Sequence, residues 1–596
     1  MHAKARRSAR RRTAVAGALV AVVVAGFAVR LVDIQVVNAQ EHLDNRAAYS
    51  GIASTQTLYG TRGSIVDANG AVLASSTMQY AAQFNPQNVK DLTREDEDGE
   101  EHVVTWEESA AAIGEIVGMS GEDIEKIVSD ALAANPDSEY APLGKKLSTE
   151  QYRKILALGL PYIHFEPVQS RAYPYGAVAG NLLGFVGTNG TPLAGYESAQ
   201  NACLEAKNGS LSYQQGSDGL IIPGTETTKA PVDGGTLQLT IDADLQWYMQ
   251  QMIAEETQNQ GAQSGAVMVV EVATGAVRAA AEYPTVDPND FGASKEDDRY
   301  SRIFSRTFEP GSTFKAITAA TLLDQGAVTP SSSVTASGFE TFPNGARVGD
   351  SFSHGTFNYT LTGALIDSSN VALSKFGELV PDETRYEYLQ KFGVGTPTDI
   401  GFPGEESGLI YPPDQWGPQG HYATTFGQAF TTTMPQVVNA YQTIANGGVR
   451  EPLHIVESCT TADGEVEKPE LSDPERVVSE DAADTTIRLL ENVATQGTLA
   501  DQVAVDGYRI GIKTGTAQKS DGKGGYKAGV YFTSIVGVVP ADDPEYIVMV
   551  TLDEPTRVTS SAATAPALQK AMTQVVKNYR VMPSETTEEP LPKFAE

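Results

Sequence analysis

The chain has 596 residues, 41% of them hydrophobic, and its formal net charge at pH 7 is −32. This length is more than one domain usually holds, and the hydrophobic fraction is enough to build sizeable cores. A nucleic-acid-binding protein needs a basic face to neutralise phosphates, so the acidic balance argues against a nucleic-acid partner.

The residue pattern gives no support for metal or redox chemistry. The chain contains two cysteines, Cys203 and Cys459, and seven scattered histidines. Two cysteines cannot make a disulfide framework or a zinc site, and no histidine pair has the spacing of metal ligands. We therefore expect no metal and no cofactor, and we interpret the cysteines as structural or free thiols that lie in different domains.

The first 34 residues have the pattern of a signal anchor. Residues 1–12 form a basic tail, and residues 13–34 are an apolar run interrupted by Arg30, which can snorkel to the membrane interface. A cleaved signal peptide is the alternative, but its apolar region would usually be shorter, and no small-x-small cleavage site precedes Arg30. Basic residues before a span stay in the cytoplasm. We predict a single-pass protein of the cell membrane with a cytoplasmic N-terminus and an extracytoplasmic remainder.

Residues 35–235 are predicted to form a mixed α/β region without obvious chemistry. Residues 61–74 predict two strands joined by a turn at Asn69-Gly70. Short helices are expected over 106–117 and 121–132, and Ser148 is a plausible cap for a third helix. This region is typical of a scaffold or docking domain.

Residues 236–580 are predicted to form a second domain of the α+β class. Strands are expected over 265–273 and 276–281 near its start and over 530–538 and 546–552 near its end, and 562–579 predicts a closing helix. Antiparallel strands at both ends, with helices between them, indicate one sheet flanked by helices. Residues 581–596 are acidic and contain proline, and we expect them to be disordered.

The second domain contains a serine and a lysine at helical spacing. Pro310 and Gly311 precede Ser312, and an apolar helix is expected to follow with Lys315 on the same face. The lysine amine could accept the proton of an attacking serine. Ser-x-x-Lys should occur about twice by chance in a chain of this length. It recurs at Ser520, where the sequence is typical of a loop.

Two further motifs follow in the same domain: Ser368-Ser369-Asn370, and Lys513-Thr514-Gly515-Thr516 after an apolar strand. Each motif alone is ordinary loop or strand-end chemistry. In this order within one domain, the three motifs are the mechanistic set of penicillin-binding proteins and class A β-lactamases.

The third motif could both activate Lys315 and bind substrate. Lowering a lysine pKa from about 10.4 to about 7 requires roughly 4–5 kcal/mol. A second ammonium, Lys513, at about 5 Å could supply about 3 kcal/mol, and partial burial the rest. Lys513, with the hydroxyls of Thr514 and Thr516, could also bind a substrate carboxylate. Gly515 would let a substrate backbone lie against the strand.

The remaining roles follow from the same chemistry. Ser368 could relay a proton to the leaving amine, and Asn370 could hold either the Lys315 amine or a substrate amide. The backbone N–H groups of Ser312 and Thr516 are the expected oxyanion donors.

With these motifs, the chain resembles the class B penicillin-binding proteins, which are monofunctional peptidoglycan D,D-transpeptidases. The resemblance extends from Arg6 to Tyr579. Further motifs that resemble the family are 62–70, 171–174 with 183–187, 195–197, 239–242, 283–284 and 513–518. It implies a transmembrane anchor, an elongated dimerisation-type pedestal (35–235) and a transpeptidase domain (236–580) similar to serine β-lactamases, with a central antiparallel sheet.

The resemblance also implies a two-step acyl transfer. Ser312 would attack the penultimate D-Ala of a stem pentapeptide on lipid-linked precursor strands, release the terminal D-Ala, and pass the acyl group to a neighbouring stem. β-Lactams would acylate Ser312 as substrate mimics. The short basic tail, single span and lack of C-terminal repeat modules resemble the septal, FtsI-type branch. That branch implies an FtsW-type glycosyltransferase and other division proteins as partners at the inner membrane.

Three alternatives stay open. The elongation-specific class B branch shares these motifs. A secreted β-lactamase shares the three motifs but would need neither a pedestal nor an anchor. The third alternative is a non-catalytic binding role. A division scaffold would tolerate the loss of Ser312, and an antibiotic sensor would need a cytoplasmic signalling domain larger than residues 1–12.

Overall fold

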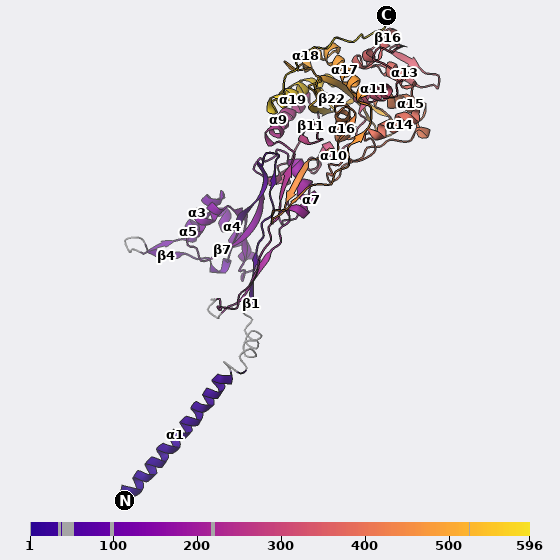
Figure 1. Ribbon diagram of the computed structural model, residues 1–596. Helices are drawn as coiled ribbons and strands as arrows, with labels where there is room; N and C mark the ends of the chain where they lie inside the picture. Colours follow the sequence, from indigo (N-terminus) through magenta and orange to yellow (C-terminus); the bar gives the residue numbers. More distant parts are fainter. Residues whose placement is uncertain (1, 34–36, 38–52, 96–100, 216–220, 524) are drawn as a thin grey trace. The chain divides into compact units, whose positions relative to one another are not determined.

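The computed structural model describes residues 2–33, 37, 53–95, 101–215, 221–523 and 525–596 (Figure 1). The described chain divides into two compact units. One comprises Met1–Gly60 with Ala206–Val232, and the other comprises Thr61–Glu205 with Asp233–Glu596. The expected boundary between anchor and pedestal, at residues 34 and 35, lies outside the described residues.

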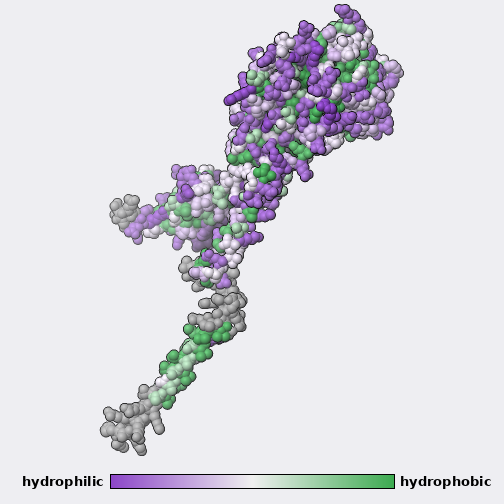
Figure 2. Space-filling view, in the orientation of Figure 1, coloured by the Kyte–Doolittle hydropathy of each residue, from purple (hydrophilic) through white to green (hydrophobic). Residues whose placement is uncertain are grey.

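The first unit contains one long helix and a small sheet. Helix α1 (His2–Val32) includes an apolar stretch, Ala14–Val32, that is long enough to cross a membrane. Its large apolar side chains, such as Leu19 and Phe27, are exposed, and Figure 2 shows this stretch as hydrophobic. These features are those of a single-pass anchor. The sheet is antiparallel, in the order β1 (Ala53–Leu58), β8 (Gly209–Gln214) and β9 (Thr227–Lys229).

The pedestal part of the second unit is built on a seven-stranded sheet. Its path is β19 (Val466–Glu467), β18 (Val456–Thr460), β10 (Thr236–Leu239), β2 (Ile65–Val66), β3 (Val72–Phe84) and β6 (Ala141–Leu147), and β7 (Ile163–Ala172) also pairs with β3. Strands β2 and β3 form the predicted Asn-Gly hairpin, with Ile65 opposite Ala74. Because β18 and β19 come from much later in the chain, this sheet joins the pedestal to the domain that follows.

Three helices cover this sheet as predicted: α3 (Trp106–Val117), α4 (Gly121–Ala134) and α5 (Thr149–Ala157). Each begins with a reciprocal capping box, at Thr105, Ser120 and Ser148, which satisfies two backbone donors of the first turn. Each buries an isoleucine in one apolar core with Phe84 and Tyr162. A hairpin of β4 (Leu92–Glu95) and β5 (Glu101–Val104) precedes α3.

Three motifs noted in the pedestal sequence meet at one buried carboxylate. Glu197, in the short helix α7 (Gly195–Ala199), is fully buried. Its carboxylate accepts hydrogen bonds from Arg62 Nε at 2.8 Å and from Arg171 Nε at 2.6 Å. Tyr173 also donates its hydroxyl to Glu197, at 3.2 Å. A buried carboxylate with two guanidinium partners is costly to disrupt, because removing one partner leaves an uncompensated charge. The helices α6 (Gly180–Leu183) and α8 (Asn201–Leu204) flank α7.

The two cysteines are not separate thiols. Cys203 and Cys459 form a disulfide with 6.0 Å between their Cα atoms, across a sequence separation of 256 residues. Cys459 lies in β18, opposite Leu237 of β10. The prediction of structural or free thiols was wrong, because the pairing of β18 with β10 brings Cys459 to Cys203 and no local pattern marks that pairing.

The rest of the second unit is an α+β domain around a five-stranded antiparallel sheet, as predicted. The strand order is β12 (Val277–Tyr283), β11 (Ser264–Glu271), β23 (Tyr546–Asp553), β22 (Tyr526–Val539) and β21 (Gly511–Ser520). Helices α9 (Ala243–Gln260) and α19 (Ala565–Asn578) pack on one face, and α16 (Met434–Ala445) packs on the other. Helix α17 (Glu480–Gln496) lies against the edge strand β21.

The elements between β12 and β21 carry the site described below. In chain order they include α10 (Arg302–Ser305), η5 (Gly311–Phe314), α11 (Lys315–Asp324), β13 (Ser333–Ala336), β14 (Phe339–Thr341), β15 (Arg347–Gly349), β16 (Phe357–Thr360), α12 (Leu361–Ile366), α13 (Asn370–Gly377), α14 (Asp382–Lys391), α15 (Pro418–Ala423), β17 (Val449–Arg450), β20 (Glu475–Arg476) and α18 (Ala500–Val503).

The segment after α19 differs from the expectation of disorder over 581–596. Its Glu588 pairs with Arg488 of α17 at 2.5 Å, and its Lys593 pairs with Asp367 at 2.5 Å. The segment is therefore tied to the domain by ion pairs of both senses, although most of its residues are exposed.

Candidate active site

Ser312 lies where the sequence placed it, at a tight turn before a buried helix. The turn η5 contains Ser312 and runs directly into α11, whose residues 315–322 are all buried. Gly311 has a φ of +57° and donates its amide to the Gly427 carbonyl at 2.8 Å, which fixes the turn. The Ser312 side chain is half-buried, and its hydroxyl has no hydrogen-bond partner within the described residues.

One hydroxyl joins the three sequence motifs. Lys315 donates its amine to both the carbonyl and the hydroxyl of Ser368, the latter at 3.2 Å. Lys513 donates to the same Ser368 hydroxyl at 3.0 Å. The two amine nitrogens therefore lie within about 6 Å of each other, the range in which like charges interact strongly inside a protein. A serine hydroxyl has one proton and two lone pairs, so it can connect both amines at once.

Burial sets the charge state of these lysines. Both side chains are fully buried. Burial, and secondly the nearby Lys513 charge, lower the pKa of Lys315 well below its usual range, while Asp350 acts in the opposite direction. Burial lowers the pKa of Lys513 to about 7. Burial is thus the larger cause of the lowered Lys315 pKa and the Lys513 charge the smaller, which is the reverse of the predicted order.

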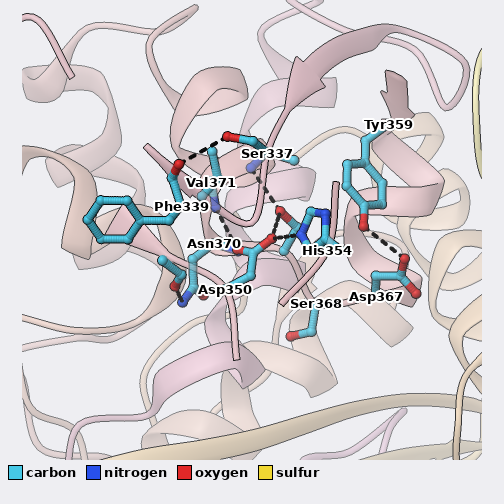
Figure 3. Close-up of polar contacts among 12 residues, drawn as sticks. Ser337, Phe339, Asp350, His354, Tyr359, Asp367, Ser368, Asn370 and Val371 are labelled. Atoms are coloured by element: carbon cyan, nitrogen blue, oxygen red, sulfur yellow. Dashed lines mark hydrogen bonds and ion pairs between the residues drawn. The ribbon is translucent and has the colours of Figure 1, made fainter. Parts of the chain in front are cut away.

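A buried carboxylate that the sequence motifs did not indicate holds the second motif in place (Figure 3). Asp350, 1% exposed at its side chain, accepts hydrogen bonds from Ser369 Oγ at 2.7 Å, Asn370 N at 2.6 Å and Val371 N at 3.0 Å. His354 Nε2 lies 2.8 Å from the same carboxylate. A carboxylate at the amides that begin α13 is stabilised by the helix dipole. Asp350 and His354 stand in an irregular stretch without periodicity, so no local signal could have identified them.

The side chain of Asn370 bonds to the backbone of β15. Its side-chain amide donates to the Gly349 carbonyl at 2.9 Å. The Lys315 amine donates to Ser368 in this structure, and the first alternative for Asn370, that it holds this amine, stays a prediction. The second alternative, contact with a substrate amide, stays a prediction.

The third motif forms the middle of strand β21. The Lys513 side chain reaches Ser368, and its amine also lies 3.5 Å from the Thr514 hydroxyl. The Thr516 hydroxyl accepts the Ser561 amide at 3.0 Å. Gly515 is buried, and a Cβ added there would come 2.5 Å from Ser534 Oγ and 3.0 Å from Thr313. The glycine therefore lets β21 approach the Ser312 turn, and its role in admitting a substrate backbone stays a prediction.

An antiparallel sheet whose edge strand brings a buried lysine to a Ser-x-x-Lys turn defines a serine acyltransferase of the penicillin-binding type. Residues 265–573 match the family described as penicillin binding protein transpeptidase domain, and residues 57–239 match the penicillin-binding protein dimerisation domain. The chain belongs to the class B penicillin-binding proteins.

Similar proteins cover most of the chain. Penicillin-binding protein PbpB of Mycolicibacterium smegmatis is 33% identical, over 90% of this chain and 85% of that protein. Peptidoglycan D,D-transpeptidase FtsI of Escherichia coli K12 is 28% identical, over 89% and 86%. The crystal structure of a peptidoglycan synthetase from Bifidobacterium adolescentis is similar with a TM-score of 0.70 and 30% identity, covering 91% of this chain and all of that one. Penicillin binding protein 3 of Mycobacterium tuberculosis, complexed with aztreonam, is similar with a TM-score of 0.69, 26% identity and the same coverages.

Proposed function

We propose that this class B transpeptidase cross-links peptidoglycan stem peptides through an acyl-enzyme on Ser312. Neutral Lys315 accepts the Ser312 proton as the hydroxyl oxygen attacks the penultimate D-Ala carbonyl carbon. The tetrahedral intermediate collapses, its peptide C–N bond breaks, and the terminal D-Ala leaves with a proton relayed through Ser368. The observation that carries this proposal is the Ser368 hydroxyl shared by two buried lysines, of which Lys315 begins the helix directly after the Ser312 turn.

The second step reverses the proton path. The amine of a neighbouring stem attacks the ester carbonyl and gives up a proton through Ser368 to neutral Lys315. The ester C–O bond then breaks, and Lys315 passes that proton to the departing Ser312 oxygen. The backbone N–H groups of Ser312 and Thr516 stabilise the oxyanion in both steps. Lys513 and Thr514, which lie side by side at the strand, bind the substrate carboxylate, and Asn370 contacts the substrate amide.

A stem-peptide assay tests this reaction. The full-length protein is incubated with a pentapeptide ending in D-Ala-D-Ala and with an amine acceptor. Stoichiometric D-Ala release with formation of a cross-linked product supports the proposal, and Ser312→Ala should abolish both. Turnover of many equivalents of penicillin, with no cross-linked product, would instead favour a β-lactamase.

The cellular role we propose is septal cell-wall synthesis, as in the FtsI-type branch. A relative of this name covers most of the chain, and α1 has the length of a single-pass anchor. The basic tail, residues 1–12, stays in the cytoplasm and the transpeptidase domain, residues 236–580, faces outward. An FtsW-type glycosyltransferase and other division proteins are the proposed partners. Depletion should give filaments or failed septa, whereas rounding or loss of polar growth would favour the elongation branch.

A further inference from the structure

The segment after α19 runs along α17. Glu588 pairs with Arg488 of α17 at 2.5 Å. Further along, the Leu591 amide donates to Asn492 Oδ1 of the same helix at 2.8 Å. These contacts lead residues 591–596, which we call the strap, to strand β16.

The strap completes the second edge of β16. One edge of β16 pairs with β13, and the other forms an antiparallel bridge between Tyr359 and Phe594. The Ala595 amide donates to the Asn358 carbonyl at 2.9 Å. The Phe594 ring lies 5.2 Å from the Tyr359 ring, and Figure 1 shows the C-terminus beside β16.

The helix after β16 is shaped to receive the strap. The Thr360 hydroxyl donates to the Pro592 carbonyl at 2.7 Å, and the Thr360 amide donates to the Lys593 carbonyl at 3.3 Å. A Cβ added to Gly363, in the first turn of α12, would lie 1.8 Å from the Lys593 oxygen. Any larger residue at this position would displace the strap.

The strap reaches the residue that precedes Ser368. Lys593 Nζ lies 2.5 Å from Asp367 Oδ1, and the Tyr359 hydroxyl donates to Asp367 Oδ2 at 2.9 Å. Figure 3 shows Tyr359 and Asp367 meeting next to Ser368. The Asp367 carboxylate is only 13% exposed, so both partners act on a largely desolvated charge.

Ser368 needs such support from both sides. Its φ of +53° is in the left-handed region, which costs a non-glycine residue of order 1–3 kcal/mol and persists only where neighbouring contacts enforce it. On one side Ser369 is bound to Asp350. We propose that the strap supplies the other side, and that Lys593 is a positioning residue that acts through Asp367 to hold Ser368 between the two lysines. This inference rests on the proposed role of Ser368.

The test compares acylation by a fluorescent penicillin in full-length protein held in detergent. Lys593→Ala should slow the acylation step about five- to tenfold while the affinity of the preceding non-covalent complex stays unchanged. Lys593→Arg, which keeps the ion pair, should restore most of the rate. Lys570→Ala is the matched control. Lys570 lies on α19 and forms an ion pair with Glu255 at 3.9 Å, longer than the pair between Lys593 and Asp367. It should acylate at the wild-type rate.

Two further variants keep the proposal falsifiable. A chain that ends after Pro590 lacks the strap and should match or exceed the defect of Lys593→Ala, with the melting temperature measured alongside. If both Lys593→Ala and this truncation acylate at the wild-type rate, the proposed positioning role of the strap is refuted. If Ser368→Ala also acylates at the wild-type rate, the proposed role of Ser368 fails. If Ser368→Ala alone is slow, that role stands and only the strap is lost.

Discussion

Asp350→Asn is the substitution that tests the architecture of the site most deeply. The Asp350 carboxylate accepts hydrogen bonds from the Ser369 hydroxyl and from the amides of Asn370 and Val371, and it faces His354. Hydrogen bonds to a buried charge contribute about 1.5–3 kcal/mol each, and they are not additive. Asparagine keeps one oxygen that can accept from the amides of Asn370 and Val371, but its NH₂ group cannot accept from the Ser369 hydroxyl or from His354. We therefore expect the free energy of unfolding to fall by about 2–4 kcal/mol.

The same substitution should change the pH dependence of acylation in a defined direction. The Asp350 charge raises the pKa of Lys315, against the lowering by burial and by Lys513. Removing that charge lowers the pKa of Lys315 further, so the acidic limb of the rate profile should move to lower pH. The maximal acylation rate should fall at least about tenfold, because Ser369 loses its anchor.

Penicillin acylation measured between pH 5 and pH 9, with thermal unfolding in parallel, checks both expectations. Asp463→Asn removes the same charge from an exposed turn, where Asp463 accepts a hydrogen bond from the Thr461 hydroxyl at 2.6 Å, and serves as the control. An acidic limb that stays in place or moves to higher pH in Asp350→Asn would refute the reasoning.

Three other predictions follow from the geometry. Acylation by the wild type should fall at low pH, because Lys315 must be neutral to accept a proton. It should also fall as the pH rises above about 7, because Lys513, with a pKa of about 7, then loses the charge that binds a carboxylate. A bell-shaped pH–rate profile would support both expectations, and a flat profile across that range would contradict them. Cys203→Ser should lower the free energy of unfolding by about 2–4 kcal/mol in calorimetry, because the disulfide closes a loop of 256 residues; unchanged unfolding would mean that the bond contributes nothing. Gly515→Ala should abolish penicillin labelling, because the added methyl group would come 3.0 Å from Thr313 and displace β21 from the Ser312 turn. Normal labelling would show that the turn can shift to accommodate the methyl group.

Local patterns predicted the elements and the three motifs because each depends on near neighbours. The caps at Thr105, Ser120 and Ser148 are signals within four residues of the helix they begin. The helix after Ser312 and the strand before Lys513 follow from apolar runs. The order of the motifs indicated that they meet, although it could not indicate that one hydroxyl, that of Ser368, connects both lysines.

Long-range contacts account for what the sequence did not predict. Asp350 reaches the second motif only because β14 and β15 fold back over α13. Cys459 meets Cys203 because β18 joins the pedestal sheet, and Lys593 meets Asp367 because the strap follows α17. Gly515 was identified from its motif, but the sequence does not tell which neighbour requires a glycine there. That depends on how β21 packs against the Ser312 turn.

Covalent labelling tests the central claim most directly. Full-length protein in detergent is treated with a fluorescent penicillin beside Ser312→Ala, and the adduct is mapped by mass spectrometry. The account predicts a long-lived adduct on Ser312 that is absent from the variant. An adduct on another residue, or equal labelling of Ser312→Ala, would contradict it.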